Sequence, residues 1–285
     1  MNKIKKVRVG ISIGDPSGIG MEVILKTFND QRMMDFCTPI LFGSQNITLN
    51  HKKLLGFSDI HINIINNFNS VKEKRLNLLD KSKYNTAINI GEPSEYSGKY
   101  AIESIERACD ALKNKEIDLL VTAPINKTAI QIHKKEFIGH TEFLQNTFKG
   151  ESLMVMCSNV MKIGFVTGHI ALKDVAKSIT KQNIIKKAEQ LNECLIKDFG
   201  IIKPKIAVLG INPHAGENDM LGDEESKTIL PAINYLNEKN IITFGPYPAD
   251  SFFIIEKLQA FDGILAMYHD QGLIPFKTLS FEEGV

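Results

Sequence analysis

Residues 7–20 read VRVGISIGDPSGIG, and this stretch decides how the rest of the chain is interpreted. Its first half is an apolar run typical of a buried strand. Its second half is a glycine-rich turn, followed by a pattern that predicts a helix beginning near Gly20. Free backbone amides at the start of such a helix can receive an anion. The turn has neither the GK[ST] of a nucleotide-phosphate loop nor a complete GxGxxG, so an anion-binding loop and a plain strand-to-helix turn both stay open.

The same order of elements recurs along the chain. Apolar runs alternate with helical patterns over residues 101–115, 181–199 and 224–239, and the runs read TPILFG, IDLLVTAPI, KIGFVTG, KIAVLGINP and FDGILAMYHD. This alternation predicts an α/β fold with a mostly parallel sheet flanked by helices. Residues 63–89 are richer in Asn, Lys and Ser, and we expect a surface excursion or a short antiparallel piece there.

The composition excludes several classes of protein. The chain has 285 residues, and 34 Lys and Arg against 33 Asp and Glu give a formal net charge of +1. No overall field would hold it on a nucleic acid or an anionic membrane, so we expect neither partner. It shows no long apolar segment or secretory leader, so we expect a cytoplasmic protein. The four cysteines form no CxxC pair, which favours reduced thiols over a disulfide framework.

Four of the seven histidines lie in loops with glycine or small polar neighbours: His140, His169, His214 and His269. The last three each follow an apolar run, so their imidazoles could converge at one edge of the sheet and hold a divalent metal. A structural role for each loop histidine is the alternative. We expect the other three, His51, His61 and His133, to lie at the surface.

Other loop residues could complete such a site. Asp250 and Asp270 could coordinate the metal or orient an imidazole, and their alternative role is loop capping. Asn126 and Lys127 in TAPINK form a donor pair suited to a carboxylate or phosphate, and Lys277 adds a further positive charge. Two enzyme classes fit these residues: a metal-dependent dehydrogenase of a small phosphorylated hydroxy acid, and a three-histidine metal hydrolase. A purely structural or binding protein is a third reading.

Seven motifs, taken in order, resemble the 4-hydroxythreonine-4-phosphate dehydrogenase family of pyridoxal phosphate biosynthesis: GDPSGIG, TAPINK, GHTEFL, TGHIAL, NPHAGE, GPYPADSFF and YHDQGLIPFK. The resemblance spans essentially the whole chain. It implies a two-domain fold like that of isocitrate and isopropylmalate dehydrogenases, not the standard Rossmann fold. We expect residues 1–127 in the first domain and residues 128–280 in the second, which would carry the dimer interface and the metal-site loops.

The resemblance also implies an activity. It is the NAD- or NADP-dependent oxidation of 4-phosphohydroxy-L-threonine to 2-amino-3-oxo-4-phosphooxybutanoate, which decarboxylates to 3-amino-2-oxopropyl phosphate. This reaction serves pyridoxal 5'-phosphate (vitamin B6) biosynthesis. A paralogous dehydrogenase of 4-phosphorylated erythronate or threonate is the alternative, since the motifs do not separate an amino group from a hydroxyl at C2.

Residue roles follow from the same resemblance. It assigns one divalent metal (Zn, Mg or Co) to His169, His214 and His269, in a site shared across a homodimer interface. The substrate is assigned to His140, Thr141 and Lys277. We expect the cofactor at Gly14, Asp15 and Gly18, and the hydroxyl proton to pass to Asp250, Asp270 or Lys277.

The end of the chain departs from the family pattern. The sequence stops at FEEGV, residues 281–285, directly after the last motif. In the family, that segment continues into further substrate-binding Asn and Arg positions and a loop that resembles the adenine-binding loop of isocitrate dehydrogenases. We therefore expect a truncated chain, with most of the first domain's C-terminal return segment, after about residue 280, absent.

Overall fold

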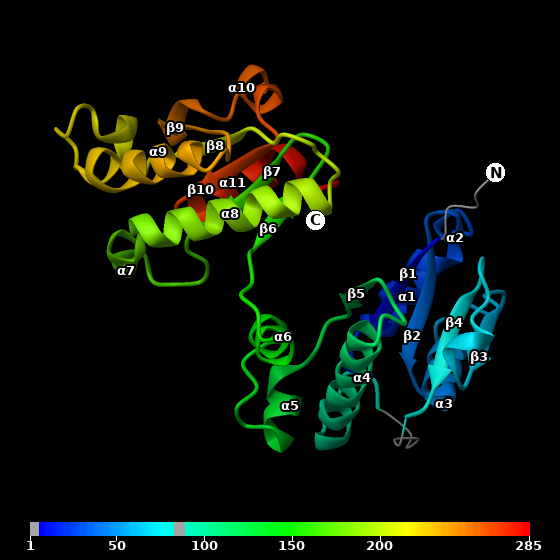
Figure 1. The fold of residues 1–285 in the computed structure, drawn as a ribbon. Coiled ribbons are helices and arrows are strands. Elements are labelled where there is room, and N and C mark those ends of the chain that lie inside the picture. Colours follow the sequence, from blue (N-terminus) through cyan, green and yellow to red (C-terminus); the bar gives the residue numbers. More distant parts are fainter. Residues whose placement is uncertain (1–5, 83–88) are drawn as a thin grey trace, which may run out of the picture. The chain divides into compact units, whose positions relative to one another are not determined.

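A computed structural model of the protein describes residues 6–82 and 89–285. The chain forms two compact units that divide between Glu151 and Ser152 (Figure 1). The sequence placed this division after residue 127. Residues beyond that point stay with the first unit because α5 (Lys127–His133) packs against α4 (Glu95–Lys113).

The first unit is built on a five-stranded sheet in the order β3-β4-β2-β1-β5. Every pairing between these strands is parallel, which confirms the predicted sheet type. Parallel strands need a crossover between them, and helices supply it. The strands are β1 (Val7–Ser12), β2 (Cys37–Gly43), β3 (Ile62–Ile65), β4 (Leu76–Asp80) and β5 (Leu119–Thr122).

Helices cover both faces of this sheet, because side chains alternate along its strands. Leu41 of β2 packs with Leu25 of α1, whereas its neighbour Phe42 packs with Ala108 of α4. Helix α4 begins at Glu95, earlier than the predicted residue 101, because Ser94 forms a capping box. The remaining helices are α1 (Gly20–Asn29), α2 (Met33–Phe36), α3 (Gln45–Leu54), the 3-10 turn η1 (Phe68–Ser70) and α6 (His140–Phe148).

The expectation of a surface excursion or antiparallel piece over residues 63–89 was wrong for the two strands that the structure places there, although residues 66–75 between them are mostly exposed. Strands β3 and β4 are parallel members of the first sheet, and β4 is buried. Asn77 interrupts the apolar run of β4 in the sequence, although this polar residue is fully buried in the structure. Its side-chain amide donates to the carbonyl oxygens of Pro39, Lys72 and Arg75 at 2.9–3.2 Å. Residues 83–88 of the predicted stretch lie outside the described residues.

The second unit holds another five-stranded sheet, in the order β6-β7-β10-β8-β9. Strand β6 runs antiparallel to β7, and the other pairings are parallel. The sheet therefore matches the predicted, mostly parallel type. Its strands are β6 (Val155–Cys157), β7 (Lys162–Phe165), β8 (Ile206–Leu209), β9 (Thr243–Tyr247) and β10 (Gly263–Ala266).

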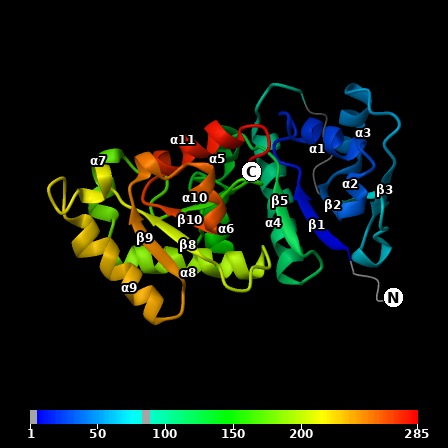
Figure 2. The same ribbon diagram turned by 90° about the horizontal axis from the view of Figure 1, so that it is seen from above.

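Figure 2 shows α8 and α9 on one side of these strands and α11 on the other. Val208 of β8 packs with Leu191 of α8 and Leu236 of α9, whereas Ala207 packs with Phe276 of α11. The helical elements are α7 (Leu172–Ser178), α8 (Lys181–Lys197), α9 (Leu230–Glu238), α10 (Ile255–Ala260) and α11 (His269–Ser280), with the shorter η2 (Pro213–Gly216), the π-helical η3 (Glu225–Ile229) and η4 (Ala249–Ser251).

Helix length and composition also bear on membrane association. Over residues 6–82 and 89–285, no helix combines the length and the apolar character that crossing a membrane requires.

Candidate metal and substrate site

Three histidine-bearing loops follow neighbouring parallel strands of the second unit. His169 follows β7, His214 follows β8 and His269 follows β10, and these strands lie side by side in the order β7-β10-β8. Carboxyl ends of parallel strands share one edge of a sheet, where open α/β sheets bind their ligands. The fold therefore places the three predicted metal loops on a common edge.

Two of the three imidazoles lie against each other. The ring centroids of His169 and His269 are 5.0 Å apart, and the Phe165 ring lies 6.3 Å from that of His269. His269 Nδ1 is 2.7 Å from Asp270 Oδ1. A carboxylate that holds the proton on Nδ1 leaves Nε2 with a free lone pair, which is the arrangement that metal-ligating histidines use.

His214 forms a different pair. Its Nδ1 lies 3.5 Å from Oδ2 of Asp250, which η4 carries just after β9, and both side chains are more than half exposed. His214 has a φ of 52°, in the left-handed region, so its loop turns sharply at this residue. Asp250 and Asp270 thus each lie beside an imidazole.

The predicted set of three histidines does not form one cluster in a single copy of the chain. Across the part of the chain that the structure describes, no group of three or more His, Cys, Asp or Glu side chains is close enough to hold a metal ion. The structure brings together His169 with His269, and His214 with Asp250. Lys277, the remaining predicted residue of this unit, lies exposed on α11.

The glycine turn of the first unit is tight and fixed. Gly14 has a φ of 68°, and a Cβ there would lie 2.2 Å from the carbonyl oxygen of Pro124. The amide of Asp15 donates to that same oxygen at 3.0 Å, and its buried carboxylate accepts from the amide of Ser17 at 2.8 Å. Gly18 donates to the Asp15 carbonyl. The predicted cofactor residues Gly14, Asp15 and Gly18 therefore form a rigid turn that is tied to the TAPINK loop.

His51 was wrongly predicted to lie at the surface. It is only 5% exposed, although His61 and His133 are exposed as expected. Burial lowers the pKa of His51, and a hydrogen bond with the backbone of Pro16 opposes that shift. The two lysines that follow His51 in the sequence misled the prediction, because α3 turns them away from the face that His51 shares with Ile47 and Thr48.

A second group of predicted residues gathers at the start of α6. His140 is the first residue of this helix, and Thr141 follows it, exposed. Burial lowers the pKa of His140, and the nearby ammonium of Lys127 lowers it further. A neutral imidazole, an ammonium and the free amides of a helix start together favour a bound anion. Asn126 contributes differently, since its side chain caps α5 by accepting from the amide of Ala129 at 3.0 Å.

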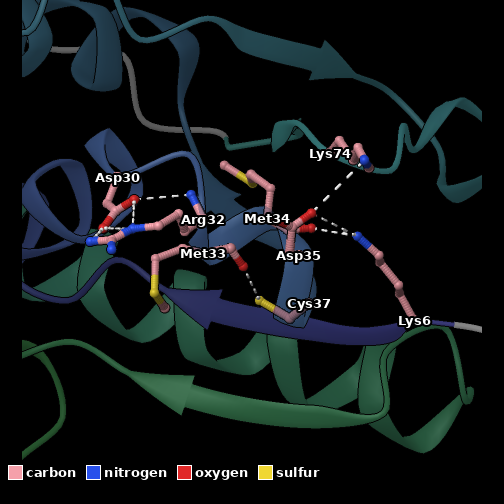
Figure 3. Close-up of polar contacts among 8 residues, drawn as sticks. All are labelled: Lys6, Asp30, Arg32, Met33, Met34, Asp35, Cys37 and Lys74. Carbon is pink, nitrogen blue, oxygen red and sulfur yellow. Dashed lines mark hydrogen bonds and ion pairs between the residues drawn. The ribbon is translucent and has the colours of Figure 1, made fainter.

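Figure 3 shows a polar cluster at the amino end of β2, which no motif predicted. Asp30 forms a paired contact with Arg32, and Asp35 lies 3.9 Å from Lys6 and 3.8 Å from Lys74. The Arg32 guanidinium lowers the pKa of Asp30 to about 2. Each of the two carboxylates is paired with at least one cation within the cluster, at the end of the sheet away from the glycine turn. We assign it to surface structure.

Comparison with protein families decides the assignment. The family model described as "Pyridoxal phosphate biosynthetic protein PdxA" matches residues 35–285. The chain belongs to the PdxA family. The motifs that carried the predicted resemblance, from TAPINK onwards, all lie within the matched residues.

Relatives of the PdxA-family chain extend this finding. A 4-hydroxythreonine-4-phosphate dehydrogenase from Bacteroides thetaiotaomicron is 43% identical over 284 residues, which are 98% of this chain and 77% of the relative. A provisionally named D-threonate 4-phosphate dehydrogenase from Clostridium botulinum is 33% identical, over 97% of this chain and 84% of the relative. The crystal structure of a 4-hydroxythreonine-4-phosphate dehydrogenase from Burkholderia phymatum is 31% identical, with a TM-score of 0.89 over 99% of this chain and 86% of that one.

These similarities confirm the predicted family and the dehydrogenase fold. The named relatives are dehydrogenases, which implies a nicotinamide cofactor for the family and removes the reason to prefer a hydrolase. The roles of individual residues do not follow from similarity alone.

Proposed function

We propose that this PdxA-family chain is a nicotinamide- and divalent-metal-dependent dehydrogenase of 4-phosphohydroxy-L-threonine in vitamin B6 biosynthesis. The observation that carries the proposal is the placement of His169, His214 and His269 on one sheet edge, with His169 and His269 in ring contact. The 43% identical dehydrogenase relative supports the substrate. Either NAD or NADP would serve as oxidant.

The proposed reaction has two steps. The C3 hydroxyl loses its proton to a base and C3 loses a hydride to the nicotinamide ring, so C3–OH becomes C3=O. The product is 2-amino-3-oxo-4-phosphooxybutanoate, whose bond between C1 and C2 then breaks with release of carbon dioxide. The electrons of that bond form a C2=C3 double bond while the C3 carbonyl becomes an enolate, and uptake of a proton at C2 restores C3=O and gives 3-amino-2-oxopropyl phosphate.

Three imidazoles form the donor set that we propose for the metal. Imidazole suits zinc and cobalt better than magnesium, which prefers oxygen ligands. A divalent cation held here supplies electrostatic stabilisation of negative charge on substrate oxygens in both steps. The His269 and Asp270 pair fits this role, since the aspartate fixes the ring tautomer.

The lack of a three-ligand group among the described residues of one copy supports a site completed by a second copy of the chain. One copy supplies ring contact between His169 and His269 but no group of three ligands among its described residues. We propose a homodimer in which His169 of one copy acts together with His214 and His269 of the other. Isologous dimers commonly build two equivalent sites of this kind.

The remaining residues would bind substrate, accept a proton and hold the cofactor. We propose that His140, Thr141 and Lys277 bind the anionic groups of the substrate, and that Lys127 helps His140. Asp250, Asp270 and Lys277 are the candidates for accepting the hydroxyl proton. Both aspartates already contact imidazoles, which favours an orienting role for them. The glycine turn at residues 14–18 would contact the nicotinamide cofactor.

Reduction of NAD or NADP by the purified chain tests this proposal. With zinc, cobalt or magnesium present, 4-phosphohydroxy-L-threonine should produce reduced cofactor, and a chelator should abolish the reaction. Absence of reduced cofactor with each metal and each cofactor would overturn the proposed dehydrogenase activity. Release of inorganic phosphate without any cofactor would favour the three-histidine hydrolase instead.

A second substrate is favoured by the Clostridium botulinum relative, whose name specifies D-threonate 4-phosphate. The two substrates differ in an amino group against a hydroxyl at C2. A site that hydrogen-bonds one of these groups leaves a buried group unpaired with the other, which can cost orders of magnitude in kcat/KM. Comparing kcat/KM for the two compounds, and for 4-phosphoerythronate, decides which one the chain uses.

A further inference from the structure

The three histidine loops are joined by a chain of hydrogen bonds that no sequence motif revealed. Thr167, two residues before His169, donates through its hydroxyl to the carbonyl of Met267 at 2.8 Å and through its amide at 3.1 Å. Met267 lies two residues before His269. The loops that carry His169 and His269 are thus tied together directly behind their imidazoles.

Gln271 continues this chain to the third loop. Its Oε1 accepts from the amide of Met267 at 2.7 Å, and its Nε2 donates to the carbonyl of Gly210 at 2.6 Å. A carboxamide can accept at one end and donate at the other, whereas an ionised carboxylate only accepts. Gln271 therefore joins the β10–α11 loop, which leads directly into His269, to the β8–η2 loop, which leads into His214.

The loop that follows Gly210, to which Gln271 donates, is held by further hydrogen bonds. Glu225 is 4% exposed, and its Oε1 accepts from the amides of Ile211 and Asn212 at 2.7 and 2.8 Å. Its Oε2 accepts from the Asn212 side chain at 2.9 Å. The amide of Gly210 also donates to the carbonyl of Tyr247, just before the loop of Asp250. Gln271 thus anchors to a loop that a buried carboxylate already fixes.

We propose that Gln271 is a positioning residue for metal binding, because its carboxamide sets the spacing between the loops that carry His269 and His214. This inference rests on the proposed metal site. Gln271 touches no metal ligand in the structure's hydrogen-bond pattern and acts through the backbone of Met267 and Gly210. Removing it should leave the hydrophobic core in place and loosen the loops alone.

The test compares zinc affinity of the full chain in the wild type and in Gln271→Met. Methionine keeps the length of the side chain but neither hydrogen bond. We expect zinc to bind the variant about 10- to 100-fold more weakly, as loss of an outer partner of a metal ligand commonly does. Gln131→Met is the matched control, since Gln131 also donates to a backbone carbonyl, that of Phe137 at 3.0 Å, away from the histidine loops.

Two further measurements separate positioning from a general structural role. In metal-free protein, hydrogen exchange at the amides of Ile211 and Asn212 should rise in Gln271→Met, while the melting temperature shifts no more than in Gln131→Met. Thr167→Val removes one hydroxyl bond and keeps the shape, so it should weaken zinc binding by a smaller factor. If Gln271→Met folds poorly, Thr167→Val still tests the proposal.

Each result has a definite meaning. Equal zinc affinity in wild type and Gln271→Met overturns the positioning role and leaves the proposed metal site intact. Weaker zinc binding that merely follows a large loss of melting temperature in both Gln271→Met and Thr167→Val also overturns it. A wild-type chain that binds no zinc, and none of cobalt or magnesium, overturns the metal site and this inference together.

Discussion

The imidazole rings of His169 and His269 lie 5.0 Å apart, centroid to centroid, on loops that follow two adjacent parallel strands. Phe165 at the end of β7 is in register with Ala266 at the end of β10, so the two loops leave the sheet side by side. This sheet edge therefore presents two of the three imidazoles that we propose as metal ligands.

Replacing any one of His169, His214 and His269 with alanine should lower metal affinity at least about tenfold, since even outer-shell losses reach that size. Zinc titration of each purified variant measures the effect. His133→Ala is the control, because His133 is exposed in the first unit. Unchanged affinity in all three variants would remove the basis for the metal site.

Mixing His169→Ala with His214→Ala tests whether two copies share each site. If His169 of one copy works with His214 and His269 of the other, a mixed dimer keeps one intact site out of two. Random exchange of subunits should then restore about a quarter of wild-type activity, because half of the dimers are mixed. No recovery after subunit exchange would place all three ligands in a single copy.

The fold was predictable where apolar runs end in glycine loops, because burial and turn chemistry leave a strong local pattern. Strands β3 and β4 were not predicted because Asn77 breaks the apolar pattern, and its burial depends partly on a hydrogen bond from its amide to the carbonyl of Pro39 on β2. The burial of His51 was not predicted because the lysines next to it obscured its helical spacing with Ile47 and Thr48. In each case a long-range contact decided what the local sequence left open.

The candidate site was predictable as a set of loops but not as a geometry. The motifs located His169, His214 and His269, whereas the pairing of His214 with Asp250 and of His269 with Asp270 depends on how the loops turn. Gln271 was visible in YHDQG, yet its role depends on reaching a carbonyl on another strand's loop. Such bridges follow from strand order, which no single motif encodes.

Gly14→Ala should destabilise the protein by roughly 2 kcal/mol or more, because a Cβ adds strain at positive φ and a backbone clash. Gly14 has a φ of 68°, and its Cβ would meet the Pro124 oxygen at 2.2 Å. Urea unfolding measures the change. Gly150→Ala is the control, since nothing lies within 4 Å of a Cβ there. Equal effects of the two substitutions would contradict the tight turn.

Lys127→Met should raise the KM for the phosphorylated substrate about tenfold or more, since a hydrogen bond to a charged group contributes about 1.5–3 kcal/mol. Its ammonium lies near His140 and the amides at the start of α6. Steady-state kinetics with the full chain measures KM and kcat separately. Lys135→Met, at an exposed position outside this group, should leave KM unchanged. A KM equal to that of wild type would exclude Lys127 from substrate binding.

The stability of the protein should fall as the pH drops below the ordinary histidine pKa of 6.5, and His51 should account for part of the loss. Burial lowers the pKa of His51 in the folded chain, so below pH 6.5 the unfolded chain binds more protons than the folded one. The contribution of His51 to the stability of the fold is fully present above pH 6.5. It is lost as the pH falls through the pKa that His51 has in the folded chain. His140 shifts in the same direction, so it contributes as well.

His51→Gln removes the titrating ring, so its free energy of unfolding should depend less steeply on pH between 7.5 and 5 than that of the wild type. Urea unfolding at several pH values gives both slopes. His61→Gln is the matched control, because His61 is exposed and its removal should leave the wild-type slope unchanged. An unchanged slope in His51→Gln would mean that His51 takes up its proton equally well in the folded and unfolded chains, contrary to its burial against Pro16.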